Sequence, residues 1–133
     1  MILSRRAHDE IVAHAREAAP AECCGLLIGA GESIVEAVRA TNLESNPNRF
    51  EIDPGDHIRA RRAARSHALD VLGFYHSHPR SPATPSASDV AEASYPDHVH
   101  VIVSVRAEPA DLRMYRIQPD GFRELTWVVR ELS

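Results

Sequence analysis

The spacing of the hydrophobic positions changes along the chain, from a helical repeat to short apolar runs. Ala7, Ile11 and Ala15 recur at helical spacing, which predicts a helix capped by Ser4 and ended by Pro20. Short apolar runs bounded by glycine or turn residues then predict strands. The expected strands cover residues 24–29, 33–41, 50–52, 71–75, 100–105, 112–117 and 122–129. The last two runs flank a Pro-Asp-Gly turn and are predicted to form a hairpin.

A second helix is predicted where the sequence reads DPGD. Asp53 suits the N-cap and Pro54 the first helical position, and the helical pattern continues to Leu69. Its apolar stripe consists of the alanines at positions 60, 64 and 68, and its arginines are assigned to a solvated face. A short third helix is expected after Asp89, ending near Ser94.

These elements together predict an α/β fold. Helices and strands alternate in the first half and strands dominate the second, which indicates a mixed β-sheet flanked by helices. The 133 residues suit a single domain over positions 1–133, because no repeat, low-complexity segment or linker interrupts them. A hydrophobic fraction of 44% is enough to build its core.

Charge and composition narrow the possible partners. A net charge of −4 argues against a general nucleic-acid binder, and no apolar run approaches the length of a membrane span. No signal-peptide core is evident, so a cytoplasmic protein is expected. Cys23 and Cys24, the only cysteines, are adjacent and are interpreted as buried thiols. Four histidines lie on the predicted helices and are assigned to the surface: His8, His14, His57 and His67.

The segment YHSHPRSPATPSASD carries the candidate chemistry. Alternate residues of a strand face the same way, so His76 and His78 would project together from the end of the strand over 71–75. Asp89 could be brought back to them by the proline-rich loop. Two histidines and one carboxylate would leave a zinc ion with an open position, which is typical of a catalytic site.

The same residues also allow a structural interpretation. Ser86 and Asp89 have the spacing of a capping box, which needs no metal. A second His-x-His pair, at His98 and His100, is assigned a structural role or a place on the surface. Hydrolysis by a metal would also need a proton carrier, and spacing alone does not choose among five glutamates. The candidates are Glu22, Glu32, Glu44, Glu51 and Glu92.

The segments PAECCGLLIG and HSHPRSPATPSASD together resemble the JAMM (MPN-plus) family of zinc metallopeptidases. The family motif is a glutamate, then His-Ser/Thr-His-Pro, then Ser-x-x-Asp, and no motif position departs from it. The resemblance implies a cytidine-deaminase-like core over nearly the whole chain. It also implies Zn²⁺ on His76, His78 and Asp89, with Glu22 as general base and then general acid, and Ser86 steadying the oxyanion.

The resemblance also implies a substrate class. Small prokaryotic members of the family hydrolyse adducts at the C-terminal Gly-Gly of ubiquitin-like or sulfur-carrier proteins, for example releasing cysteine during cysteine biosynthesis. Two alternatives remain open: a non-catalytic MPN scaffold module and a DNA-repair-associated JAMM-like protein. A cytidine deaminase is disfavoured because the Pro-Cys-x-x-Cys ligand pair is missing.

Overall fold

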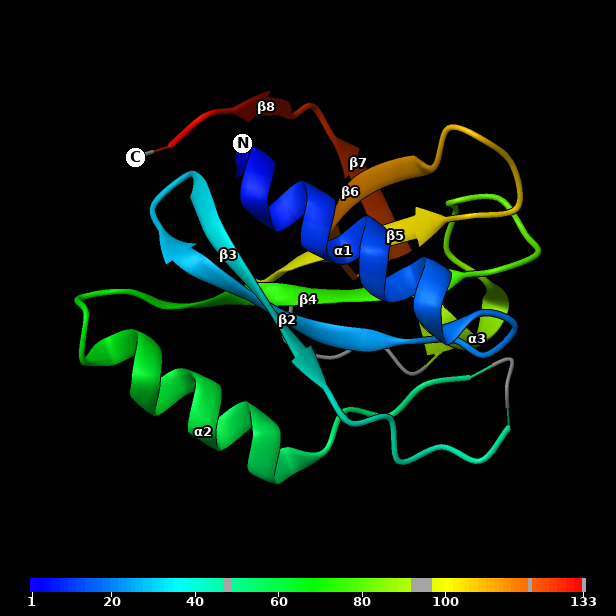
Figure 1. Ribbon diagram of the computed structural model, residues 1–133, viewed down its shortest axis with the longest axis horizontal. Helices are drawn as coiled ribbons and strands as arrows, with labels where there is room; N and C mark the ends of the chain where they lie inside the picture. Colours follow the sequence, from blue (N-terminus) through cyan, green and yellow to red (C-terminus); the bar gives the residue numbers. More distant parts are fainter. Residues whose placement is uncertain (47–48, 92–96, 120, 133) are drawn as a thin grey trace.

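The computed structural model describes residues 1–46, 49–91, 97–119 and 121–132. Its centre is an eight-stranded mixed sheet with the strand order β7-β6-β5-β4-β2-β3-β1-β8, which matches the predicted fold class (Figure 1). The elements are β1 Ile2–Ser4, α1 Arg5–Ala18, β2 Cys24–Ala30, β3 Ser33–Ala40, α2 Pro54–Arg65, β4 Asp70–His78, α3 Ala87–Ala91, β5 Val99–Ser104, β6 Asp111–Gln118, β7 Gly121–Leu125 and β8 Val128–Arg130. Within the described residues, no helix is long and apolar enough to cross a membrane.

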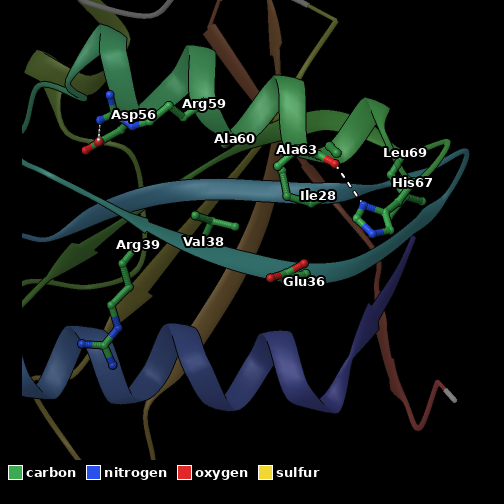
Figure 2. Close-up of a pocket in the computed structure, with 11 residues that line it drawn as sticks. Ile28, Glu36, Val38, Arg39, Asp56, Arg59, Ala60, Ala63, His67 and Leu69 are labelled. Atoms are coloured by element: carbon green, nitrogen blue, oxygen red, sulfur yellow. Dashed lines mark hydrogen bonds and ion pairs between the residues drawn. The ribbon is translucent and has the colours of Figure 1, made fainter.

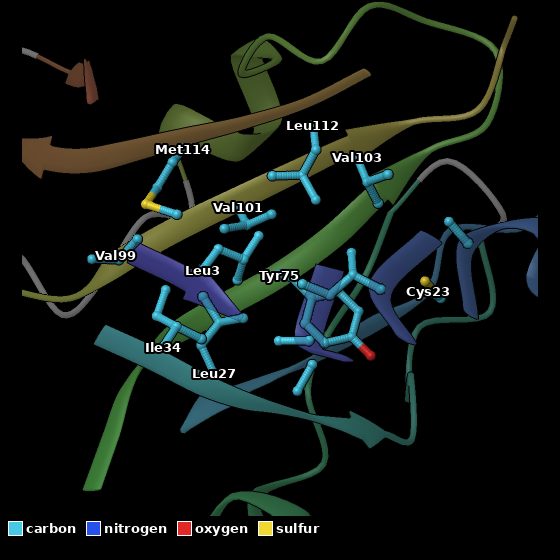
Figure 3. Packing of buried hydrophobic residues seen from close by; sticks show 14 residues of the cluster. Leu3, Cys23, Leu27, Ile34, Tyr75, Val99, Val101, Val103, Leu112 and Met114 are labelled. Carbon is cyan, nitrogen blue, oxygen red and sulfur yellow. The ribbon is translucent and has the colours of Figure 1, made fainter. Parts of the chain in front are cut away.

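Helices α1 and α2 cover opposite faces of this sheet (Figure 1). The prediction for α1 is confirmed: Ser4 caps it by accepting a hydrogen bond from the Ala7 amide at 3.0 Å, and its apolar stripe is buried. Around that stripe lies the larger hydrophobic cluster, which includes the fully buried Leu27 and Tyr75 of the central strands (Figure 3). A smaller cluster lies under α2 on the other face.

Helix α2 starts where predicted but ends four residues early. Asp53 is its N-cap, and the helix stops at Arg65 instead of reaching Leu69. The reason is a left-handed residue, Ala68, with a φ of 60°, which lets the Leu69 amide bond back to the Ala64 carbonyl at 2.9 Å. Glycine usually occupies that position, so an alanine there gave no stop signal. Ala68 is exposed and does not extend the apolar stripe.

Two strand predictions are wrong. Residues 50–52 form no strand, and only an isolated bridge joins Asn42 to Ile52. The run over 122–129 is two strands, because β7 ends at Leu125 and β8 begins at Val128. These strands form the two edges of the sheet, and β8 pairs in parallel with β1. The chain takes only three residue-to-residue steps from the end of β7 to the start of β8, and such a stretch spans at most about 11 Å. Because these two strands are the edges of the sheet, the sheet curls until its edges approach each other.

Strand β4 positions the candidate chemistry at the middle of the sheet. It lies between β2, which runs antiparallel to it, and β5, which runs parallel. Its Tyr75 ring fills the space beside Gly25, where a Cβ atom would lie 2.2 Å from the ring carbon Cε1. Only glycine allows this close approach, so β2 and β4 meet tightly next to the histidines.

Candidate metal centre

The two histidines of the motif lie at the C-terminal end of β4. His76 pairs with Cys24 of β2, and both imidazoles are buried. Their Nε2 atoms lie 3.2 Å apart, which confirms the prediction that they project from the same face.

Asp89, on the short helix α3, joins the two histidines. Its Oδ2 atom lies 3.2 Å from His76 Nε2 and 3.1 Å from His78 Nε2. Ligand atoms bound to one tetrahedral zinc ion at the usual 2.0–2.1 Å lie about 3.3 Å from one another. The triangle formed by these three atoms therefore has the size that one such ion requires.

Hydrogen bonding prepares His78 to act as a ligand. Its Nδ1 atom lies 2.8 Å from the Pro82 carbonyl oxygen, which can only accept, so Nδ1 carries the proton. In the neutral ring the Nε2 lone pair then points toward Asp89. The ring of His76 stacks on Phe50 with 4.2 Å between the ring centroids. Such contacts fix the orientation of an imidazole, as metal sites commonly require.

The proline-rich loop that returns Asp89 is fastened to the sheet. Ser104 of β5 donates a hydrogen bond to the Ser81 carbonyl at 2.6 Å. Tyr115 of β6 donates another to the Ala83 carbonyl at 2.6 Å, and Ala83 itself is fully buried. The loop is thus held by two neighbouring strands, and this places α3 over the end of β4.

Ser86 forms the predicted capping box with Asp89. The Asp89 amide donates to Ser86 Oγ at 3.0 Å, and the Ser86 amide donates to Asp89 Oδ2 at 2.8 Å. Both the capping and the metal interpretations therefore describe the same geometry. Because Ser86 Oγ accepts in this box, its own proton stays available for a further acceptor.

Glu22 lies on the segment between α1 and β2 and faces the histidines. Its ligand atom and those of His76 and His78 all lie within 4.8 Å of one another. Asp89 is closer to the histidines than this limit. His76 and His78 therefore belong to two possible sets of three ligands, one completed by Glu22 and the other by Asp89. The Glu22 Oε1 atom is buried and has no hydrogen-bond partner among the described residues.

Burial and neighbouring charges set the protonation of these groups. Burial raises the pKa of Glu22 to about 7. Burial also lowers the pKa of His76, which favours its neutral, ligating form. For Asp89, burial raises the pKa, but hydrogen bonds with His76 and His78 outweigh it and hold the pKa well below its usual range. The carboxylate is therefore charged, as a metal ligand must be.

The other candidate residues lie elsewhere. His98 and His100 contact the Phe74 ring instead of joining the histidines of β4. Cys23 and Cys24 are buried free thiols, as predicted, and burial raises their pKa values to about 11 and about 12. Of the rival glutamates, Glu32, Glu44 and Glu51 belong to no cluster of potential ligands in the described part of the chain, and Glu92 lies outside that part.

Some contacts of the site were not predicted. Phe50 and Asn42 fall in a segment that composition marks as a loop or a brief strand, and no local pattern shows that it folds against His76. His14, assigned to the surface, is half-buried and its Nδ1 atom lies 2.7 Å from the Tyr75 hydroxyl. Its helical position gave no sign of that buried partner on β4.

A hollow in the surface lies away from this centre. It is a groove of about 640 Å³ between α2 and the strands β2 and β3 (Figure 2). Its lining includes the apolar Val38 of β3 and Ala60 of α2, together with the charged Asp56 and Arg59 of α2. None of the five motif residues lines this groove, so it is distinct from the candidate metal centre.

Comparison with protein families and characterised relatives gives extensive matches. A family model described as prokaryotic homologs of the JAB domain matches residues 4–118. A desampylase from Haloferax volcanii is 38% identical over 136 residues, which cover 96% of this chain and 94% of that protein. A CysO-cysteine peptidase from Mycobacterium tuberculosis is 36% identical over 112 residues, which cover 82% of this chain and 77% of that protein.

Solved structures agree with this fold. A solution structure of a Desulfitobacterium hafniense protein matches with a TM-score of 0.90 and 33% identity, covering 99% of this chain and 94% of that one. A structure described as a metalloprotease-like zinc site in the proteasome and signalosome matches with a TM-score of 0.65. That second match is 23% identical and covers 98% of both chains, so it shows a shared fold.

Proposed function

Because this chain belongs to the prokaryotic homologues of the JAB domain, the JAMM family that its motif resembles, we propose that it is a zinc-dependent peptidase. In this proposal it acts in the cytoplasm and hydrolyses the amide bond after the C-terminal Gly-Gly of a ubiquitin-like or sulfur-carrier protein. Release of cysteine from such a carrier is one reaction of this kind.

The observation that carries the proposal is the triangle of ligand atoms. His76 Nε2, His78 Nε2 and Asp89 Oδ2 lie 3.1–3.2 Å from one another. Burial lowers the pKa of His78, but its hydrogen bonds with Asp89 and the Pro82 carbonyl outweigh it and raise the pKa. This favours a proton between His78 Nε2 and the charged Asp89 oxygen, where a metal ion would take its place. The donor set therefore fits a divalent ion, and two histidines with one carboxylate leave one position of a tetrahedral zinc for the reaction. The zinc site described for the structural neighbour supports the choice of metal.

Glu22 is the residue that would move the proton. When bound, a zinc ion supplies Lewis acidity, which lets a water molecule give up a proton near neutral pH. The partnerless Glu22 Oε1 would accept that proton as the water oxygen attacks the scissile carbonyl. As the C–N bond breaks, Glu22 would pass the proton to the departing amine. No covalent bond to the protein forms at any stage.

Ser86 would stabilise the negative charge that develops on the carbonyl oxygen. Its hydroxyl keeps a free proton because Oγ accepts the Asp89 amide. We expect Ser86→Ala to lower kcat about a hundredfold, the usual loss for one such donor. Zinc content should stay stoichiometric, since the Ser86 amide still donates to Asp89. Steady-state kinetics with metal analysis checks this, and an unchanged kcat would limit Ser86 to capping α3.

The substrate class is supported by two relatives of this chain. One is named a desampylase and the other a CysO-cysteine peptidase, and both names describe enzymes that act on a small protein or its adduct. The Gly-Gly tail itself is our inference. An extended tail without bulky side chains would let the last carbonyl reach buried histidines at the end of β4.

The proposal is tested with a carrier protein that bears a C-terminal Gly-Gly-cysteine adduct. The purified protein should release one cysteine, visible as a loss in intact mass, and a chelator should stop the release. Restoring zinc should restore it. Zinc binding without cleavage would keep the metal centre but move the search to other conjugates. Neither metal nor cleavage would contradict the proposal and favour a scaffold module.

A further inference from the structure

In the described part of the chain, no hydrogen bond to the Glu22 side-chain atom Oε1 explains why the carboxylate lies beside the histidines. The carboxylate atom Oε1 has no hydrogen-bond partner among the described residues, so no neighbour aims it at the histidines. The main chain that carries Glu22 sets the position of its Cα and so the distance over which the carboxylate has to reach. We propose that Ser77 and Asn42 are positioning residues that hold the peptide unit between Glu22 and Cys23. This inference rests on the proposed function, because it assigns these residues to the base of that reaction.

Ser77 lies between the two histidines and holds one side of this peptide. The Cys23 amide donates to Ser77 Oγ at 2.9 Å, and the Ser77 amide donates to the Cys23 carbonyl at 3.1 Å. The regular pairing of β2 with β4 ends one residue earlier, at Cys24 and His76. The fully buried Ser77 side chain therefore extends the pairing by one residue, toward Glu22.

Asn42 holds the other side of the same peptide. Its Nδ2 atom donates to the Glu22 carbonyl at 3.1 Å and to the Arg49 carbonyl at 3.1 Å. Its Oδ1 atom accepts from the Glu44 amide at 3.0 Å and from the Glu51 amide at 2.8 Å. Both donor hydrogens and both lone pairs are thus used, so the Asn42 side chain is fixed.

The two contacts act on one rigid group. The Glu22 carbonyl and the Cys23 amide belong to a single planar peptide unit. Asn42 holds its oxygen and Ser77 holds its nitrogen, from two different segments of the chain. A plane fixed at both polar atoms fixes the position of the adjoining Glu22 Cα, from which the side chain extends toward the histidines. Since Ser77 also lies between His76 and His78, the base and the ligands share one anchor.

The test replaces each anchor in the full-length protein and follows cleavage of the carrier adduct. We expect Ser77→Ala and Asn42→Ala each to lower kcat by about 10- to 100-fold, because a misplacement near 1 Å can cost about a hundredfold. KM should change less than about twofold and zinc should stay stoichiometric, since the ligands are untouched. Ser77→Thr keeps the hydroxyl and suits a strand, so it should restore most of kcat.

Ser4→Ala is the matched control. Ser4 is also a buried serine that accepts a backbone amide, from Ala7, and donates to the Val35 carbonyl at 2.8 Å, but it lies on β1. The Ser4→Ala variant should lose thermal stability as the Ser77→Ala variant does, but it should keep the wild-type kcat. An equal fall of kcat in Ser4→Ala would mean that general loosening explains the effect. A wild-type kcat in Ser77→Ala or Asn42→Ala would overturn the positioning role of that residue.

A measurement without substrate separates this inference from the proposed function. In the wild type and in Ser4→Ala, the Cys23 amide should be protected from hydrogen exchange. In Ser77→Ala it should exchange at least about tenfold faster than in Ser4→Ala, because its acceptor is gone. Should the wild type cleave no carrier, the proposed function fails, and this exchange still tests the anchor. Equal protection of Cys23 in both variants would overturn the anchor, whatever the enzyme cleaves. If Ser77→Ala does not fold, Asn42→Ala carries the kinetic test.

Discussion

Replacing Glu22 with glutamine should lower kcat by about 10²- to 10⁴-fold, the range that general acid–base catalysis usually contributes. Glutamine has the same shape but cannot take a proton from water or return it to an amine. His76, His78 and Asp89 are unchanged, so zinc content should remain stoichiometric. Steady-state kinetics on the carrier adduct together with metal analysis measures both quantities. An active variant would point to another base, of which Glu92 is the nearest rival by sequence.

The stability of the same variant gives an independent check. Burial raises the pKa of Glu22 from 4.5 to about 7, so the folded state holds its proton more tightly than the unfolded chain does. The contribution of Glu22 to the stability of the metal-free protein is therefore greatest below pH 4.5 and falls as the pH rises toward 7. Glu22→Gln lacks this fall. In urea unfolding with a chelator, the variant should match the wild type at low pH and exceed it at pH 8.

Replacing His78 with alanine should abolish tight zinc binding. Removing a residue that only hydrogen-bonds to a metal ligand commonly lowers metal affinity about 10- to 100-fold. His78 would be a ligand itself, so the loss of affinity should be larger. Its loss also removes one of the two imidazoles that stabilise the Asp89 charge. Hydrolysis should stop, and the melting temperature should no longer rise when zinc is added. Competition with a chromophoric chelator measures the affinity.

His98→Ala is the matched control for that variant. His98 belongs to the second His-x-His pair and stacks on Phe74, whose side chain lies on the same side of β4 as His76. Zinc affinity and kcat should both stay near wild type. If zinc affinity instead survived in His78→Ala and fell in His98→Ala, the metal would belong to the second pair.

Much of the candidate site could be predicted because its parts obey local rules. Strand alternation placed His76 and His78 on one face, and the capping-box spacing anticipated the reciprocal bonds of Ser86 and Asp89. The glutamate was different: residue spacing left five candidates, and only the family motif selected Glu22. The structure brings Glu22 to the histidines, and its catalytic role stays a prediction.

The remaining features depend on contacts between distant parts of the chain. The segment that carries Asn42 and Phe50 has a loop-like composition, and only its tertiary contacts place it beside Glu22 and His76. The end of α2 was missed because Ala68 adopts a conformation that alanine seldom takes. Strand β8 was merged with β7 because no glycine or proline interrupts residues 122–129, whereas the partner that separates them, β1, is more than 120 residues away.

The pairing of β1 with β8 has a mechanical consequence. The two strands run parallel, with Ile2 opposite Val128 and Ser4 opposite Arg130. Tension pulling backward on the chain before β1 and forward on the chain after β8 slides the strands along each other. All hydrogen bonds between them are then loaded in shear at the same time, instead of opening one after another. A protein-unfolding machine that pulls the chain in this way would meet its resistance at the edge of the sheet, before the strands that carry the histidines are disturbed.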